Sequence, residues 1–284
     1  MGRMREWLSN KWRSAIRLAH FVHLLSNWPT VWMCIRKKKP LPPLRFRNGL
    51  ILNHGKYDDP LLLLDEVFIR RLYDFKTDAP SDGIMVDIGA NIASVTEFFA
   101  VACPTLRIHA YEPNPAAFEM LQRNIQDNGM GKRITAFPEA VGPQSGSLSL
   151  WVDVNTTLST AYMKDSPGAG GRRIDVPMVS LDEVWRRLNG APIWLLKIDT
   201  EGAEGDILEG ASKSTLEAVQ NAIIEYHDNI VPGVSERCHR VLKASGFTWR
   251  TFVHPWKEGI IYASRSPVPE SIVGSAPTKA MPST

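Results

Sequence analysis

Residues 84–94 read IMVDIGANIAS, a short strand pattern followed at once by a turn and the start of a helical pattern. Ile84–Ile88 is apolar except for Asp87, and Gly89 gives the backbone the freedom that a sharp turn needs. The helical pattern over 94–101 follows without a linker. A buried strand, a glycine-containing turn and a helix predict the first half of a strand–helix–strand unit.

The same alternation continues on both sides of this segment. Further strands are predicted at 49–53, 106–111, 134–137, 147–152, 176–179, 193–198, 222–226, 248–252 and 259–263, and helices at 59–73, 115–126, 181–188, 204–219 and 234–244. Almost wholly apolar strands are typical of sheets covered by helices on both faces. The pattern therefore predicts an α/β protein with a doubly wound sheet, which binds ligands at the carboxyl ends of its strands.

Composition divides the chain into three parts. We expect a basic amphipathic helical extension over 1–43, ended by prolines, then the α/β domain over 44–263 and a Pro/Ser-rich flexible tail over 264–284. A loop rich in Gly, Ser and Thr is expected at 156–171 as a cover for the substrate.

Positive charge is concentrated in the N-terminal extension. The whole chain has a formal net charge of +3, but residues 1–40 hold nine Lys or Arg and only one acidic residue. The remainder is slightly acidic, which argues against nucleic-acid binding. The extension, with a helix expected over 4–25, either packs on its own domain, which we favour, or makes peripheral contact with anionic lipid.

No transmembrane helix or secretory signal is predicted, because polar residues and a proline interrupt the most apolar early stretch, 18–35. The three cysteines are widely spaced and lack metal-ligand spacing. They are typical of core residues in a reducing compartment. We therefore expect a cytoplasmic protein, with the inner membrane surface as an alternative location.

Acidic residues follow the first two strands of the unit. Asp87 precedes a turn that holds Gly89 and Asn91, and Glu112 closes the next strand in the segment YEPNP. An acidic residue at that second position accepts hydrogen bonds from ribose hydroxyls in sheets of this kind. The pair predicts a ligand that contains adenosine.

The turn also indicates which adenosine ligand is bound. A dinucleotide has a pyrophosphate, which needs several glycines in the turn, yet only Gly89 precedes Ala93. A negative Asp87 would repel a pyrophosphate but would suit an ammonium group and a sulfonium cation. S-adenosylmethionine has both and no phosphate. Gly89 would let the backbone approach its methionine part, and Asn91 would offer a side-chain amide.

Two later strand ends carry further candidate residues. LKIDTEGAE (196–204) delivers three carboxylates within six residues, and IIEYHD (223–228) ends in Glu225, His227 and Asp228. Clustered carboxylates raise one another's pKa, which is common at functional sites. Asp199 and Glu204 are also typical of residues that cap a helix, and Asp228 is typical of a solvent-exposed surface position. Lys197 is suited either to orienting a carboxylate or to a structural role.

These motifs together resemble the FkbM family of S-adenosylmethionine-dependent methyltransferases, over roughly residues 45–263. The resemblance is carried by VDIGANIAS (86–94), YEPNP (111–115), EAVG (139–142), VPMVSLDE (176–183), LKIDTEGAE (196–204) and IIEYH (223–227). It implies a Rossmann-like class I methyltransferase fold, with a seven-stranded, mostly parallel sheet and an N-terminal helical extension. One departure is Ala93, where the family usually has glycine.

The resemblance also assigns site residues. Cofactor contacts map to Asp87, Gly89, Asn91, Glu112 and Asp199, with Glu139 and Ala140 near the adenine. Family members mostly methylate hydroxyls of sugars or secondary metabolites, so the expected acceptor is a small molecule or glycan.

The expected reaction is an in-line methyl transfer to oxygen. Orientation of the acceptor supplies most of the acceleration, and a general base assists. Our candidates for the base are His227 first, then Asp199 or Glu201. A divalent metal held by Asp199, Glu225 and Asp228 is an alternative that we do not favour, so no metal site is predicted.

Two other functions remain open from the sequence. One is a noncatalytic module that binds an adenosine ligand within a membrane-associated assembly, against which the carboxylate density at 199–204 argues. The other is an NAD-dependent oxidoreductase, which the missing glycines disfavour.

Overall fold

The structure is a computed structural model that describes residues 19–55, 58–74, 79–152, 159–160, 171–253 and 258–268. Most of the expected helix over 4–25, of the loop over 156–171 and of the tail over 264–284 lies outside these residues. None of the helices in the described ranges combines the length and apolar composition needed to cross a bilayer.

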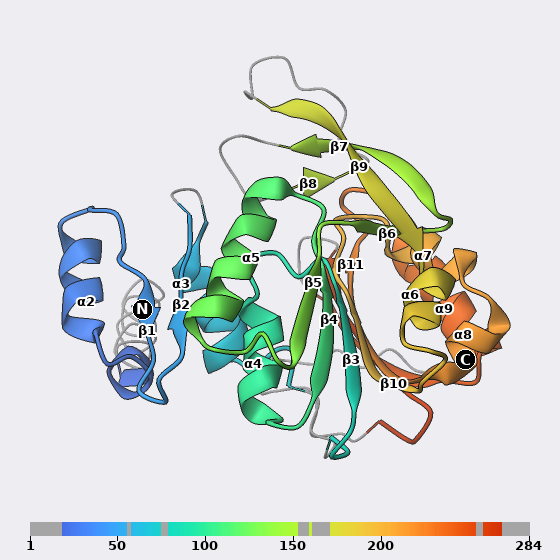
Figure 1. Cartoon of the computed structure of the whole chain (residues 1–284), viewed down its shortest axis with the longest axis horizontal. Helices are drawn as coiled ribbons and strands as arrows, with labels where there is room; N and C mark the ends of the chain where they lie inside the picture. The colour runs from blue at the N-terminus through green and yellow to red at the C-terminus, as the bar shows by residue number, and fades with distance from the viewer. Residues whose placement is uncertain are drawn as a thin grey trace, which may run out of the picture.

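Seven strands form the central sheet, in the order β12-β13-β11-β10-β3-β4-β5 (Figure 1). Their bounds are β3 Ile84–Ile88, β4 Arg107–Tyr111, β5 Ile134–Phe137, β10 Ile193–Ile198, β11 Val219–His227, β12 Thr248–Val253 and β13 Glu258–Ser264. All pairs from β11 to β5 are parallel, and β13 is antiparallel to both neighbours. The predicted Rossmann-like, mostly parallel sheet is confirmed, and chain order reverses between β3 and β10.

Helices cover both faces of this sheet. One face carries α4 (Ser94–Ala102) and α5 (Pro115–Asp127), and the other carries α6 (Leu181–Arg187), α7 (Glu204–Gly210), α8 (Lys213–Ala218) and α9 (Val234–Ala244). Alternate residues of β3 pack on opposite sides: Val86 joins the core beneath α6–α9, whereas Met85 joins the core beneath α4 and α5. Burial on both faces explains why these strands are apolar throughout.

The helix predicted over 204–219 is in fact two helices and the start of a strand. Gly210 lies against the backbone of Pro143, where an added Cβ would come within 2.4 Å of it. Ser212 then caps α8 by accepting a hydrogen bond from the N–H of Thr215, at 3.3 Å. The chain enters β11 at Val219. Contact and capping therefore override the continuous helical periodicity.

A second, four-stranded sheet lies over the carboxyl ends of the central strands (Figure 1). Its order is β6-β9-β7-β8, with β6 Ala140–Gly142, β7 Gly146–Val152, β8 Ser159–Thr160 and β9 Arg172–Ser180. The sequence predicted β7 and part of β9 (176–179) as strands but neither β6 nor a separate sheet. Ala140, Leu150 and Val176 form a small apolar cluster of their own within it.

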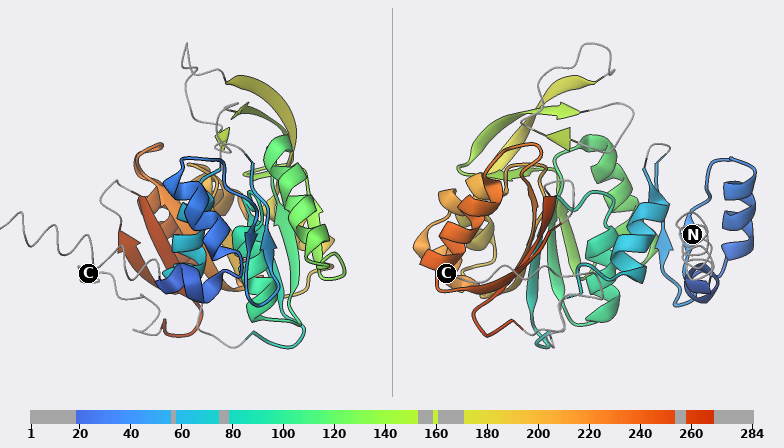
Figure 2. Two further views of the ribbon diagram at one scale, coloured as in Figure 1. Left: turned by 90° about the vertical axis from the view of Figure 1, so that its left-hand side faces the viewer. Right: turned by 180° about the vertical axis from the view of Figure 1, so that it is seen from behind.

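The described part of the N-terminal extension packs against the rest of the chain. It contains α2 (Trp28–Arg36), and β1 (Leu44–Arg45), β2 (Ile51–Leu52), α3 (Pro60–Leu63) and the π-helix η1 (Leu64–Ile69) follow. Leu25 and Val31 are buried in a cluster with Leu44. The Asn53 side chain donates to Asn124 of α5, at 2.9 Å. α2 nevertheless stands at one end of the molecule in Figures 1 and 2.

Candidate active site

A cavity opens at the carboxyl ends of β3, β4 and β10, on the side that the four-stranded sheet covers. It is lined by Ile88, Gly89, Asn91, Tyr111, Glu112, Pro113, Glu139, Ala140, Val141, Leu148, Leu150, Asp199, Thr200, Glu201 and Ala203. Seven of the nine site residues predicted from the sequence line it. The other two, Asp87 and His227, do not.

Glu112 is a buried carboxylate held by backbone donors on both of its oxygens. Oε2 accepts from the N–H of Asn91 at 2.9 Å, and Oε1 accepts from the N–H of Asn114 at 2.8 Å. Burial raises the pKa of Glu112 to about 7, against the opposing effect of those two hydrogen bonds. A carboxylate has about four acceptor positions, so each oxygen retains one that can serve a ligand in the cavity.

Asp87 is placed differently from the expectation. Its side chain is fully buried behind the cavity, 3.2 Å from Nζ of Lys197, and accepts a hydrogen bond from Thr96 of α4. Lys197 also donates to the carbonyl of Gly89, at 2.6 Å. The Asp87 charge is therefore neutralised within the protein. The negative charge that faces the cavity belongs to Glu112, Asp199 and Glu201 instead, and direct contact of Asp87 with a ligand is not supported.

Gly89 lets the turn after β3 approach the end of β10 closely. Its φ is +74°, and an added Cβ would lie 1.7 Å from the carbonyl oxygen of Asp199. Only glycine fits this approach, so the residue sets the geometry of the cavity floor. Ala93, which replaces the family glycine, adopts a φ of +81° at the start of α4 and is fully buried. The structure thus accommodates alanine in a left-handed conformation there.

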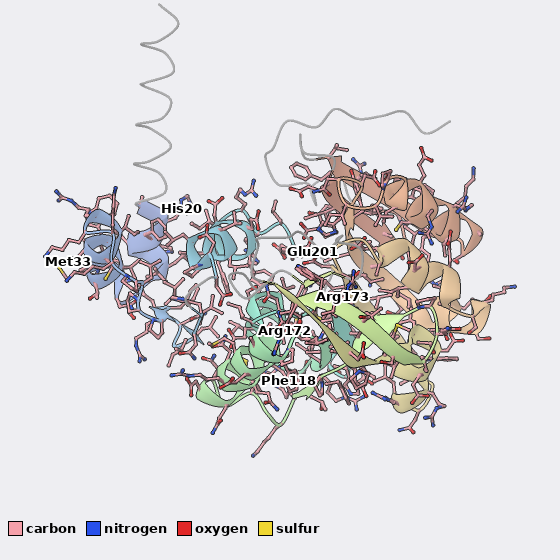
Figure 3. All side chains as sticks on the ribbon, turned by 90° about the horizontal axis from the view of Figure 1, so that it is seen from above. His20, Met33, Phe118, Arg172, Arg173 and Glu201 are labelled. Atoms are coloured by element: carbon pink, nitrogen blue, oxygen red, sulfur yellow. The ribbon has the colours of Figure 1, made fainter. Side chains whose placement is uncertain are left out.

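Four side chains meet where β10 and β11 end. His227 is buried, and its Nδ1 lies 3.0 Å from Oε1 of Glu204, which also accepts from the N–H groups of Thr200 and Gly202. Its Nε2 lies 3.5 Å from Glu201 and 3.9 Å from Asp199. Glu201 lies near the middle of the molecule when seen from above (Figure 3).

The carboxylates control the protonation of this group. Burial opposes a charge on His227, but the hydrogen bond to Glu204 and the charges of Asp199, Glu204 and Glu201 outweigh it and raise the pKa of His227 to about 10. Burial raises the pKa of Glu201 to about 7, although His227 opposes the change. Near neutral pH the imidazole therefore holds a proton, which fits an ion-pair partner better than the free base favoured from the sequence.

Glu225 and Asp228, which the sequence grouped with Asp199 as metal ligands, are each hydrogen-bonded to another residue. Tyr73 donates a hydrogen bond to Oε2 of Glu225, and burial raises the pKa of Glu225 to about 8. Asp228 accepts from the N–H of Ser235, at 2.9 Å, and from its hydroxyl. The metal-ligand set considered from the sequence, Asp199 with Glu225 and Asp228, is therefore not the set that the structure gathers.

Sequence reasoning missed several residues of the cavity. Tyr111 stacks on Phe137, with ring centroids 4.7 Å apart, and Leu148 and Leu150 reach the cavity from β7. The position of Tyr111, next to Glu112 at a strand end, was a usable signal. Nothing in the local pattern of β7 indicated that its leucines face a ligand cavity.

The fold and the position of the cavity define the class of protein. It is an α/β protein of the Rossmann-like type, and its cavity lies at the edge of the sheet where such proteins bind ligands. The sequence model of the "Methyltransferase FkbM domain" matches residues 87–247, more than half of the chain. The chain belongs to the FkbM family of methyltransferases.

The chain is also similar to two known methyltransferases and to one solved structure. "Methyltransferase sdnD" of Sordaria araneosa is 28% identical over 209 residues, covering 64% of this chain and 80% of that protein. "31-O-demethyl-FK506 methyltransferase FkbM" of Streptomyces tacrolimicus is 26% identical over 239 residues, covering 72% and 88%. A solved structure of methyltransferase FkbM from Methylobacillus flagellatus has a TM-score of 0.47 at 14% identity, covering 90% of this chain and 60% of that one.

Proposed function

We propose that this methyltransferase transfers the methyl group of S-adenosylmethionine to a hydroxyl oxygen of a sugar, glycan or secondary metabolite. The observation that carries the proposal is Glu112, a buried carboxylate fixed by two backbone N–H groups beside a cavity at the switch point of the sheet. Its remaining acceptor positions suit two ribose hydroxyls.

The polar groups of the cavity favour a cationic nucleoside. Glu112, Asp199 and Glu201 all line it, and Oδ1 of Asn91 is buried without a hydrogen-bond partner among the described residues. Acceptors and negative charges would repel a pyrophosphate but would attract an ammonium or sulfonium group.

S-adenosylmethionine supplies, when bound, an electrophilic methyl group that a hydroxyl oxygen displaces in line from sulfur. The protein's own contribution is to orient that oxygen and to accept its proton. Asp199 and Glu201 border the cavity, so one of these carboxylates would take up the proton, and the protonated His227 behind them would be their ion-pair partner. An oxygen acceptor is supported by the name of the Streptomyces tacrolimicus relative, a 31-O-demethyl-FK506 methyltransferase.

Calorimetry with S-adenosylhomocysteine and, separately, with NAD tests the cofactor. We expect one equivalent of S-adenosylhomocysteine to bind and NAD not to bind. Transfer of a labelled methyl group to pools of hydroxylated acceptors then tests the reaction. Binding of NAD alone would contradict the proposal in favour of an oxidoreductase, and cofactor binding without transfer to any acceptor pool would favour a noncatalytic module.

A further inference from the structure

Asp199, Glu201 and His227 present one ligand atom each to a common point. Their nearest carboxylate oxygens and ring nitrogen all lie within 4.8 Å of one another, and Nε2 of His227 is 3.5 Å from Glu201 and 3.9 Å from Asp199. First-row divalent cations hold such ligands at about 2.0–2.2 Å, which sets tetrahedral ligands roughly 3.3–3.6 Å apart. Only a small closure of the three side chains is needed to reach that spacing.

His227 provides a second observation that points to a ligand. Only 4% of the residue is exposed. Its Nδ1 is hydrogen-bonded to the buried Glu204, whereas its Nε2 points toward the carboxylates of Glu201 and Asp199. A carboxylate that fixes one ring nitrogen, so that the other is directed at a metal, is the usual arrangement behind a metal-ligating histidine.

The charge balance also favours a cation at this point. Lys197 lies 3.5 Å from Asp199 but is already paired with Asp87, at 3.2 Å. Three carboxylates, Asp199, Glu201 and Glu204, then surround the histidine. A divalent cation would replace the proton on His227, because a metal ligand must be unprotonated.

We propose that Asp199, Glu201 and His227 form a binding site for a first-row divalent cation at the edge of the cavity. Both carboxylate side chains are 27% exposed and border the cavity, so the remaining coordination positions face it. Given the proposed function, on which this role rests, the cation would bind the acceptor oxygen. With Asp199 and Glu201 bound to the cation, the hydroxyl proton would pass to water rather than to a carboxylate. The oxygen electron pair would form the bond to the methyl carbon while the carbon–sulfur pair goes to sulfur.

Titration of the chelator-treated full chain with Mn²⁺ tests the site. We expect one equivalent to bind, and Glu201→Gln and His227→Gln each to weaken Mn²⁺ binding at least tenfold. Asp228→Asn is the matched control, because this acid follows His227 directly but is bonded to Ser235, and we expect a change of less than twofold. Electron spin-echo spectra should show nitrogen coupling to bound Mn²⁺ that His227→Gln removes.

Each outcome separates the metal site from the proposed function. Thermal unfolding and S-adenosylhomocysteine binding are measured on every variant, so a misfolded variant is recognised and replaced by Glu201→Asp or His227→Asn. If wild type binds S-adenosylhomocysteine but not Mn²⁺, or if Mn²⁺ affinity survives all these substitutions, the metal site is wrong and methyl transfer still stands. If Mn²⁺ binds and S-adenosylhomocysteine does not, the site stands and the proposed function fails.

Discussion

At the ends of β3 and β4 each carboxylate is matched by a donor, whereas at the ends of β10 and β11 three carboxylates surround one histidine. Asp87 is paired with Lys197, and Glu112 accepts two backbone N–H groups. Asp199 and Glu201 lie near His227 without ideal hydrogen-bond distances to it. The first region is a fixed scaffold, and the second holds excess negative charge beside the cavity.

Removal of the Asp87–Lys197 pair should have the largest effect on the first of these two regions. We expect Lys197→Met to lower the free energy of unfolding by about 3–5 kcal/mol, because it leaves a buried carboxylate without its cation. Urea unfolding measures the loss. In the double variant with Asp87→Asn the loss should be smaller than for Lys197→Met alone. Additive losses would show that the two side chains are not coupled.

Gly89 joins the two regions, and its substitution should be the next most harmful. An added Cβ would meet the carbonyl of Asp199 at 1.7 Å, so we expect Gly89→Ala to cost about 2–4 kcal/mol. Gly49→Ala is the matched control, since Gly49 has a φ of +93° but nothing within 4 Å of an added Cβ. It should cost only about 1–2 kcal/mol. Equal losses in urea unfolding would contradict the role of the close approach.

The Glu112→Gln variant tests whether this residue of the scaffold contacts the ligand. We expect S-adenosylhomocysteine binding to weaken about 10–100-fold, because hydrogen bonds to a charged group contribute about 1.5–3 kcal/mol. Calorimetry measures the change, and stability should be much less affected. An unchanged affinity would argue against a ribose contact.

The same carboxylate predicts a pH dependence of binding. Burial raises the pKa of Glu112 to about 7, so the group is largely protonated below that pH and loses acceptor capacity. Affinity for S-adenosylhomocysteine should therefore rise toward pH 7, by at most about tenfold per pH unit, and level off above it. The Glu112→Gln variant should lack this step. A step of equal size in the variant would assign it to another group.

Ala93→Gly should have the smallest effect. Relief of the left-handed alanine is worth about 1–2 kcal/mol. The greater flexibility of glycine in the unfolded chain and the loss of a buried methyl group together cost about the same amount. We expect a net change in the free energy of unfolding below about 1 kcal/mol. A loss above about 2 kcal/mol would show that the methyl group is needed for packing.

Sequence reasoning worked best where one local pattern determines structure. The strands Ile84–Ile88 and Ile193–Ile198 were predicted with their observed bounds, since apolar runs buried on both faces leave few alternatives. It also indicated that Asp87 and Glu112 lie at the ends of neighbouring strands, β3 and β4. The four-stranded sheet was missed, because its pairing joins segments far apart in the chain and leaves no local periodicity.

Side-chain partners were harder to predict than strand ends. The partner of Asp87 is Lys197, 110 positions later, and the sequence indicated for this lysine either the orientation of a carboxylate or a structural role, without naming Asp87. Glu204 was expected to cap a helix, yet its carboxylate also fixes Nδ1 of His227. Asp228 carries the same charge as Glu201 but turns toward Ser235. Residue type and spacing do not determine where these side chains point, because the packing around each side chain selects its rotamer.

The position of Lys197 directly beside Asp87 in the parallel ladder also bears on how β10 finds its alignment. The sequence IWLLKI is apolar toward both layers of helices, so burial of its other side chains discriminates weakly between adjacent registers. A shift by one residue would turn the lysine toward the opposite layer. It would place an ammonium group among aliphatic side chains and leave Asp87 uncompensated. Charge pairing thus aligns a strand whose hydrophobicity alone would tolerate slippage.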